Sequence, residues 1–140
     1  MVKRESKFIT LLVAGLSILL VFSAVAYSQK GDPQKGERIY NQYCVPCHGE
    51  QGKGDGTRAK FEQFDPMPRN HTNGEYMNKR PYEALVDVEK NSGKAQNFSH
   101  IMPPWKTILT DDDVHDVLSF VRSLAVPSYK SGMEEDKKGR

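Results

Sequence analysis

Apolar residues recur at helical spacing in three stretches of this 140-residue chain, and each stretch predicts a helix. The first helix begins at Asp32 and Pro33, because aspartate is a good cap and proline suits the first helical position. One face of this helix carries residues spaced three and four apart: Gly36, Ile39, Tyr40 and Tyr43. A glycine within a helix costs up to about 1 kcal/mol relative to alanine. We therefore expect another helix to cross closely over Gly36.

The other two helices lie in the second half of the sequence. Residues 81–91 form one, with Gly93 as its end and a short apolar stripe: Ala84, Leu85 and Val88. The last helix begins at Thr110, which approximates a capping box with Asp113, and ends at Pro127. Its apolar face repeats at helical spacing: Val114, Val117, Leu118, Phe120, Val121 and Leu124. The sequence therefore predicts an all-α domain.

The segments between the helices are rich in glycine, asparagine and lysine. Residues 49–56 carry glycine at every second or third position, which favours turns. They lack the Gly-Lys-Ser/Thr ending and the preceding strand of a phosphate-binding loop. We expect one domain over residues 32–127, a polar linker over 27–31 and a disordered charged tail over 128–140.

Residues 1–26 are predicted to direct export. Lys3, Arg4 and Lys7 form a positive start, residues 8–26 are uncharged, and a small-x-small site precedes Tyr27. The uncharged stretch is close to the roughly 20 residues that span a bilayer. It is thus either a cleaved signal peptide of the general secretory route or a retained N-terminal membrane-anchoring helix. Both place the domain in the periplasm or on the extracytoplasmic face of the cytoplasmic membrane.

The charge balance argues against one class of partner. The chain has 20 basic and 18 acidic residues, of which three basic and one acidic fall within 1–26, so the rest carries 17 of each. A nucleic-acid-binding domain needs a basic face. We expect no nucleic-acid partner, and any docking charge has to be local.

The candidate chemistry is concentrated in Cys44-Val45-Pro46-Cys47-His48, which contains the only two cysteines. Cys-x-x-Cys-His is the attachment pattern of a c-type haem. Cys44 and Cys47 would form thioethers to one covalently bound haem c, and His48 would be the proximal iron ligand. Zinc would need more ligands, a thioredoxin-like pair would need a preceding strand, and a disulfide would leave His48 unexplained. A buried macrocycle would also supply apolar core that this short domain lacks, so we expect the haem-free chain to be loose or unfolded.

Met102 is the best candidate for the sixth iron ligand. A thioether favours reduced iron and suits an electron carrier, and two prolines stiffen the chain after Met102. His100 is the main rival, and other histidines and methionines stay open as alternatives: His71, His115, Met67, Met77 and Met133. A proline-region carbonyl, at Pro68 rather than Pro66, is expected to accept the second ring N–H of His48. Trp105 would either bond a haem propionate or pack in the core, and Arg69 would either pair with a propionate or lie exposed.

Together these residues resemble the class I c-type cytochromes, particularly the small bacterial mono-haem domains. The pattern covers Gly36-x-x-x-Tyr40-x-x-x-Cys44-x-x-Cys47-His48-Gly49, Pro66-x-Pro68-Arg69, Met102-Pro103-x-Trp105 and the 117–121 stretch. The resemblance implies three to four helices wrapped around one haem, with His48 and Met102 as axial ligands and Gly36 crossing against Phe120. Phe120 stands where tyrosine is more usual. Lys79-Arg80 precedes Pro81 where a Ser/Thr cap is commoner, so this helix should begin without a good cap.

The leading functional expectation is a non-enzymatic carrier of single electrons between respiratory donor and acceptor proteins, with the iron cycling between Fe(III) and Fe(II). A membrane-anchored haem subunit of an oxidase or reductase complex is the main alternative. A gas-binding haem sensor or enzyme, in which Met102 is displaced, is a third.

Overall fold

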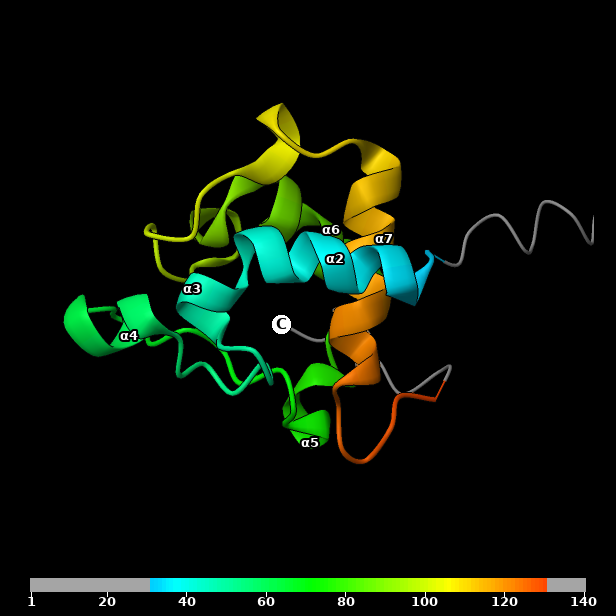
Figure 1. Ribbon diagram of the computed structural model, residues 1–140, viewed down its shortest axis with the longest axis horizontal. Coiled ribbons are helices and arrows are strands. Elements are labelled where there is room, and N and C mark those ends of the chain that lie inside the picture. Colours follow the sequence, from blue (N-terminus) through cyan, green and yellow to red (C-terminus); the bar gives the residue numbers. More distant parts are fainter. Residues whose placement is uncertain (1–30, 131–140) are drawn as a thin grey trace, which may run out of the picture. The chain divides into compact units, whose positions relative to one another are not determined.

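The computed structural model describes residues 31–130, apart from the side chain of Ala95. This part of the chain is helical and contains no strand (Figure 1). Its elements are α2 (Pro33–Tyr43), α3 (Val45–His48), α4 (Thr57–Phe61), α5 (Gly74–Met77), α6 (Tyr82–Asn91), η1 (Gly93–Gln96), η2 (Trp105–Thr107) and α7 (Asp111–Ser123). The three long helices α2, α6 and α7 are those expected, and the all-α prediction is confirmed. No helix within residues 31–130 is long and apolar enough to cross a bilayer.

Several sequence predictions fall outside the described residues. They concern the export segment or anchor at 1–26, the linker up to residue 30, and the tail from residue 131. They stay predictions.

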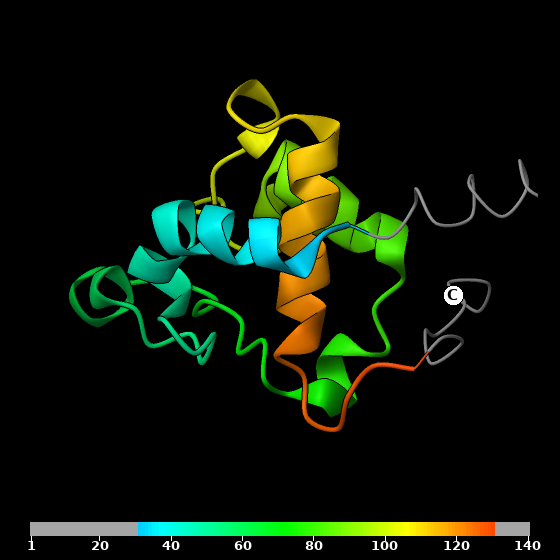
Figure 2. The ribbon, with the colours of Figure 1, turned by 45° about the vertical axis from the view of Figure 1, so that its right-hand side comes forward.

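Helices α2 and α7 cross, as Figure 2 shows, and Gly36 lies against α7 at this crossing. A Cβ atom built on Gly36 would overlap the main-chain carbonyl of Asp116 and would lie 3.0 Å from Cβ of Phe120. The same crossing is fastened by the Asp32 amide, which donates a hydrogen bond of 2.6 Å to the Asp116 carboxylate. The predicted close crossing, with Gly36 against Phe120, is confirmed.

The starts of both crossing helices are set by local chemistry. The Asp32 carboxylate accepts hydrogen bonds from the amides of Gln34 and Lys35. At α7 the Thr110 hydroxyl accepts from the Asp113 amide, and the Asp113 carboxylate accepts from the Thr110 amide, which completes the expected capping box. These bonds satisfy amides that have no partner within a helix.

Helix α6 begins at Tyr82, and its cap residue Pro81 makes no side-chain capping bond, as the sequence indicated. The expectation that Gly93 ends this helix is wrong. Ser92 ends it, in the left-handed region with φ of 82°, and Gly93 begins η1. The prediction assumed that glycine would take the positive-φ position, where a serine is unusual.

Two buried clusters link the three long helices. One contains Tyr40 of α2, Met77 of α5 and Val117 and Val121 of α7, and the other contains Leu109, Val114 and Leu118. Side chains of α6, including Leu85, pack against both. The functional pocket lies on this shared scaffold.

The long segment between α3 and α6 is tied to both ends of the domain. The His71 amide donates to the Gly52 oxygen at 2.6 Å, and the Gly54 amide donates to the His48 oxygen at 2.8 Å. Near α5, the Val126 amide donates to the Thr72 oxygen at 3.0 Å, and the Gly74 amide donates to the Val126 oxygen at 3.1 Å. The loop that follows the cysteine motif is thus held against the residues that follow α7.

Candidate haem site

The Cys-x-x-Cys-His motif forms a tight turn at the junction of two helices. Cys44 is the C-cap of α2, and α3 carries Cys47 and His48. The His48 amide donates to the Cys44 oxygen at 2.9 Å, which places the second thiol and the imidazole one turn after the first thiol. Gly49 follows with φ of 78°, a left-handed conformation that glycine adopts readily.

The two thiols are free and lie in different surroundings. Cys47 lines the pocket described below, whereas Cys44 packs against the core cluster around Tyr40 and is not one of the lining residues. Burial raises the pKa of both thiols, and Arg58 partly opposes this at Cys47. Burial thus favours the neutral thiol form of both side chains.

The pocket lies beside this motif and has mostly apolar walls. Its empty volume is about 930 Å³, counting the part open to solvent. Segments from most of the domain line it: Cys47, His48, Phe64, Pro66, Met67, Pro68, Arg69, His71, Tyr76, Met77, Arg80, Ala84, Leu85, Val88, Glu89, Gln96, Phe98, Ser99, Met102, Leu118 and Val121. Such walls suit a large, flat and largely apolar macrocycle.

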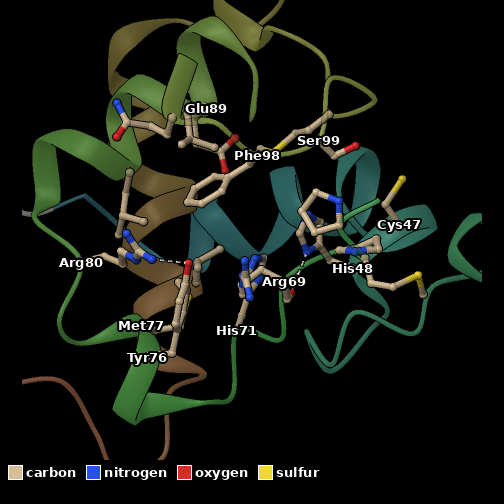
Figure 3. A pocket seen from close by; sticks show the side chains of 18 of the residues that line it. Cys47, His48, Arg69, His71, Tyr76, Met77, Arg80, Glu89, Phe98 and Ser99 are labelled. Carbon is tan, nitrogen blue, oxygen red and sulfur yellow. Dashed lines mark hydrogen bonds between the residues drawn. The ribbon is translucent and has the colours of Figure 1, made fainter. Parts of the chain in front are cut away.

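His48 is oriented by a main-chain carbonyl. Its Nδ1 atom lies 3.1 Å from the Arg69 oxygen, and Figure 3 shows this bond across the pocket wall. A carbonyl can only accept, so Nδ1 carries the hydrogen and Nε2 keeps the lone pair that binds a metal. Burial lowers the pKa of His48, which favours the neutral ring. The expectation that Pro68 provides this acceptor is wrong by one residue, although Pro68 does line the pocket.

Gly54 explains why the acceptor is the Arg69 carbonyl and not the Pro68 carbonyl. A Cβ atom on Gly54 would overlap the Pro68 oxygen, so that carbonyl is turned toward the glycine-rich loop and away from His48. The Arg69 carbonyl, one peptide later, faces the imidazole.

His71 is a further site residue whose position the sequence did not reveal. Its ring stacks on His48 with centroids 4.2 Å apart and an angle of 21° between the planes. It is buried, its Nδ1 atom has no hydrogen-bond partner, and burial holds its pKa well below the ordinary value. A neutral His71 beside His48 adds no positive charge next to a prospective ligand.

Met102 lines the same pocket as His48, although the two lie far apart in sequence. Met67 and Met77 also line it. Met67 is 54% exposed, on the loop that leads to Arg69, and Met77 is 4% exposed, within the core cluster around Tyr40. Of the rival histidines, His100 is exposed and not part of the lining, and His115 is hydrogen-bonded to the Tyr82 hydroxyl at 2.7 Å.

Trp105 lies outside the pocket lining. Its ring packs 5.5 Å from that of Tyr43 and against the cluster around Leu118. The packing alternative therefore describes its position.

Two guanidinium groups flank one aromatic ring at the pocket wall. The Arg69 and Arg80 guanidinium carbons lie 4.3 Å and 4.4 Å from the centre of the Tyr76 ring, and Arg80 donates to the Tyr76 hydroxyl at 2.6 Å (Figure 3). Neither arginine forms an ion pair with a carboxylate in the described part of the chain. Haem carries two propionate carboxylates, and arginine recognises carboxylates well. The apolar lining and the two guanidinium groups thus fit the polarity and the charge of haem.

The cytochrome c family profile matches residues 33–125 of the sequence. The chain belongs to the cytochrome c family. A cytochrome c carries covalently bound haem and transfers electrons, and the cysteine motif and the apolar pocket of this chain agree with that role.

A search of curated proteins found no match to this cytochrome c. It is similar to a solved structure from Kuenenia stuttgartiensis, the reducing HAO-like protein complex Kustc0457/Kustc0458, with 30% sequence identity and a TM-score of 0.51. The match covers 67% of this chain and 43% of that chain, so this cytochrome c spans less than half the length of that relative.

Proposed function

We propose that this cytochrome c holds a single haem and carries one electron at a time between redox partner proteins outside the cytoplasm. His48 and Met102 would be the axial ligands, and Cys44 and Cys47 the points of covalent attachment. One observation carries the proposal: His48 and Met102, from distant parts of the sequence, line one apolar pocket together with Cys47. When bound, haem c supplies a reversible one-electron Fe(III)/Fe(II) couple.

The surroundings of the three lining methionines support Met102. Met67 is two residues before Arg69, whose carbonyl holds His48, and its side chain is 54% exposed. Met77 is committed to the core with Tyr40 and Val117. Met102 lies on the segment between η1 and η2, directly before Pro103 and Pro104. It belongs neither to the loop that bonds His48 nor to the core cluster around Tyr40. A His/Met ligand pair gives the higher potential that suits an electron carrier.

The chain's own residues bind and tune the cofactor without reacting themselves. The Arg69 carbonyl fixes His48 in the tautomer that ligates through Nε2. Leu85, Val88 and Leu118 give the pocket apolar walls. Arg69 and Arg80 would neutralise the propionates. The function requires neither a catalytic base nor a substrate subsite.

The predicted export segment supports a location outside the cytoplasm. Covalent attachment of haem c would follow passage of residues 1–26 into or across the membrane. The charged N-terminal residues and the uncharged stretch over 8–26 are the basis for this part of the proposal.

A second candidate function is that of a haem subunit within a larger oxidoreductase complex. It is favoured by one observation, the similarity to part of a reducing HAO-like protein complex. In that case the redox partners would be subunits of the same assembly. Co-purification from the native membrane, combined with the mass of the mature N-terminus, separates a retained, complexed subunit from a free carrier.

The direct test of the main proposal is a pyridine haemochrome spectrum combined with the intact mass of the purified protein. The expected result is one haem per chain, attached by two thioethers, and a reversible one-electron couple. A chain that matures without covalent haem, or that holds more than one, would overturn it. Carbon monoxide binding to the reduced protein at neutral pH would instead indicate an open iron position and a gas-binding role.

A further inference from the structure

Glu89 is a carboxylic side chain in an otherwise apolar wall of the haem pocket. It lies on α6 four residues after Leu85, so both share the face that lines the pocket together with Val88. Only 8% of Glu89 is exposed. Figure 3 shows its side chain at the upper wall of the pocket, whereas His71, Tyr76 and Met77 form the lower wall.

One oxygen of the Glu89 carboxyl group is buried without a partner. Within the described part of the chain, no group donates a hydrogen bond to its Oε2 atom. The ion pairs of Arg58 with Glu62 and of Lys90 with Asp111 do not involve Glu89. A buried and unpaired carboxylate costs several kcal/mol, so such a group binds a proton more readily.

The charged groups around Glu89 do not offset this cost. Burial raises the pKa of Tyr40 and of Cys44, and a negative Glu89 contributes to this rise at both groups. The arginines of the same pocket, Arg69 and Arg80, stack on Tyr76. The other titratable groups on the elements packed around α6 are engaged or exposed: Lys90 bonds Asp111, Lys106 bonds Asn91, Asp87 bonds Asn91 and Gln96, His115 bonds Tyr82, Arg122 bonds the Arg80 oxygen, Asp116 bonds the Asp32 amide, and Lys94 is exposed. Burial alone raises the pKa of Glu89 to about 7.

We propose that Glu89 is a proton-binding site coupled to electron transfer in this pocket. This inference rests on the proposed haem function. When one electron enters the pocket from an external one-electron donor, the Glu89 carboxylate takes up one proton from water and becomes a neutral carboxylic acid. On oxidation it returns that proton to water. No bond to a metal forms or breaks, and the charge of the added electron is balanced by the proton.

The coupling between the proton and the electron arises because Glu89 and the cofactor would occupy the same region of low dielectric constant. An added electron removes one positive charge from the same water-poor region, so the carboxylate loses attraction and the neutral acid is favoured. By reciprocity, protonation of Glu89 makes electron uptake more favourable. The chain would thus transfer an electron together with a proton.

The test is a spectroelectrochemical titration of the haem-loaded protein from about pH 5 to about pH 9, on both sides of the Glu89 pKa. We expect the reduction potential to fall as the pH rises, with a limiting slope of about 59 mV per pH unit, the equivalent of a tenfold change in equilibrium constant for one electron. Glu89→Gln should flatten this dependence. Glu83→Gln is the matched control, because it removes an exposed carboxylate from the same helix, and it should leave the dependence unchanged.

A second measurement follows the proton itself. Redox-difference infrared spectra of the wild-type protein should show a protonated carboxylic acid band that appears on reduction and shifts in D₂O. Glu89→Asp, which keeps the acid on a shorter stem, should shift this band and move the pH midpoint of the potential; it also serves if Glu89→Gln fails to fold. A pH-independent wild-type potential, or a dependence that persists unchanged in Glu89→Gln, would overturn the inference. Either result would leave a normal haem couple in place, whereas failure of the proposed function would show as the absence of covalent haem.

Discussion

Tyr40 donates its phenolic hydrogen to the main-chain oxygen of Gly49 at 3.0 Å, directly after the haem-attachment motif. The ring of Tyr40 is fully buried, and the same carbonyl also accepts from the Gly52 amide at 3.0 Å. The core of the domain is thus bonded to the turn that ends α3. This contact fixes the position from which His48 enters the pocket.

Replacing Tyr40 with phenylalanine removes this bond but keeps the ring. Because the Gly49 oxygen retains one donor, we expect the free energy of unfolding to fall by about 0.5–1.5 kcal/mol. Urea denaturation of the haem-loaded protein measures this change. Tyr43→Phe is the control, since the Tyr43 hydroxyl bonds only the exposed Gln42 side chain, and its effect should stay within about 0.5 kcal/mol. Equal losses in the two variants would contradict the assignment.

Gly36→Ala tests the helix crossing. The added methyl group would overlap the Asp116 carbonyl, and main-chain atoms cannot move aside as a flexible side chain can. We expect a net loss of about 1–3 kcal/mol in unfolding free energy, even though alanine favours the helix by up to about 1 kcal/mol. Thermal denaturation provides the measurement. Glu37→Ala, an exposed neighbour on the same helix, should be near neutral, and a stabilised Gly36→Ala protein would show that the crossing is not tight.

Met102→Ala tests the proposed sixth ligand. Loss of the thioether should abolish the long-wavelength methionine-to-iron(III) charge-transfer band and lower the reduction potential on the order of 0.1 V, a fraction of the roughly 0.8 V that axial ligands can span. Visible absorption and a redox titration measure both effects. Met67→Ala is the control, because Met67 also lines the pocket but is half exposed. A band that survives in Met102→Ala and disappears in Met67→Ala would reassign the ligand.

Stability should depend on pH through Glu89. Its pKa in the folded protein is raised to about 7 from an unfolded value of 4.5, so the folded state binds more protons between these values. The contribution of Glu89 to the free energy of unfolding should therefore be greatest below about pH 4.5 and should fall as the pH rises to about 7. At 1.36 kcal/mol for each unit of pKa difference, the total loss is roughly 3 kcal/mol. Denaturation at a series of pH values checks this. Glu89→Gln should lose this slope, and a wild-type slope that it leaves unaltered would place the titration elsewhere.

Removal of the haem should loosen the domain. The residues that line the pocket include Leu85, Val88, Leu118 and Val121, which would face water without the cofactor. Because the buried apolar core of residues 31–130 is small, we expect haem-free protein to lose cooperative unfolding and much of its far-ultraviolet circular dichroism. A native-like, cooperatively folded apoprotein would contradict this expectation.

Local patterns in the sequence were sufficient for the main helices and their caps. Asp32, Thr110 and Asp113 form capping hydrogen bonds with amides no more than three residues away. Gly36 indicated a close helix crossing, because a glycine within a helix is destabilising unless close packing requires it. Contacts between residues far apart in the sequence were harder to predict from these local patterns. Whether the Pro68 or the Arg69 carbonyl faces His48 depends on Gly54, which belongs to a different loop.

Two further pocket residues differ in this respect: the sequence indicated His71 only as an alternative iron ligand and assigned no role to Glu89. His71 stacks on His48 because of a main-chain bond to Gly52, and no periodicity signals such a contact. Glu89 could have been found, because it continues the spacing of Leu85 on the apolar face of α6. An acidic residue in an apolar helical stripe is the signal that was missed.

The paired hydrogen bonds of Thr72 and Gly74 with Val126 join the segment between His71 and Met77 to the residues that follow α7. This wall of the pocket therefore depends on residues that lie beyond the last helix. A chain cut off after Ser123 would keep all three long helices and would still lack this support.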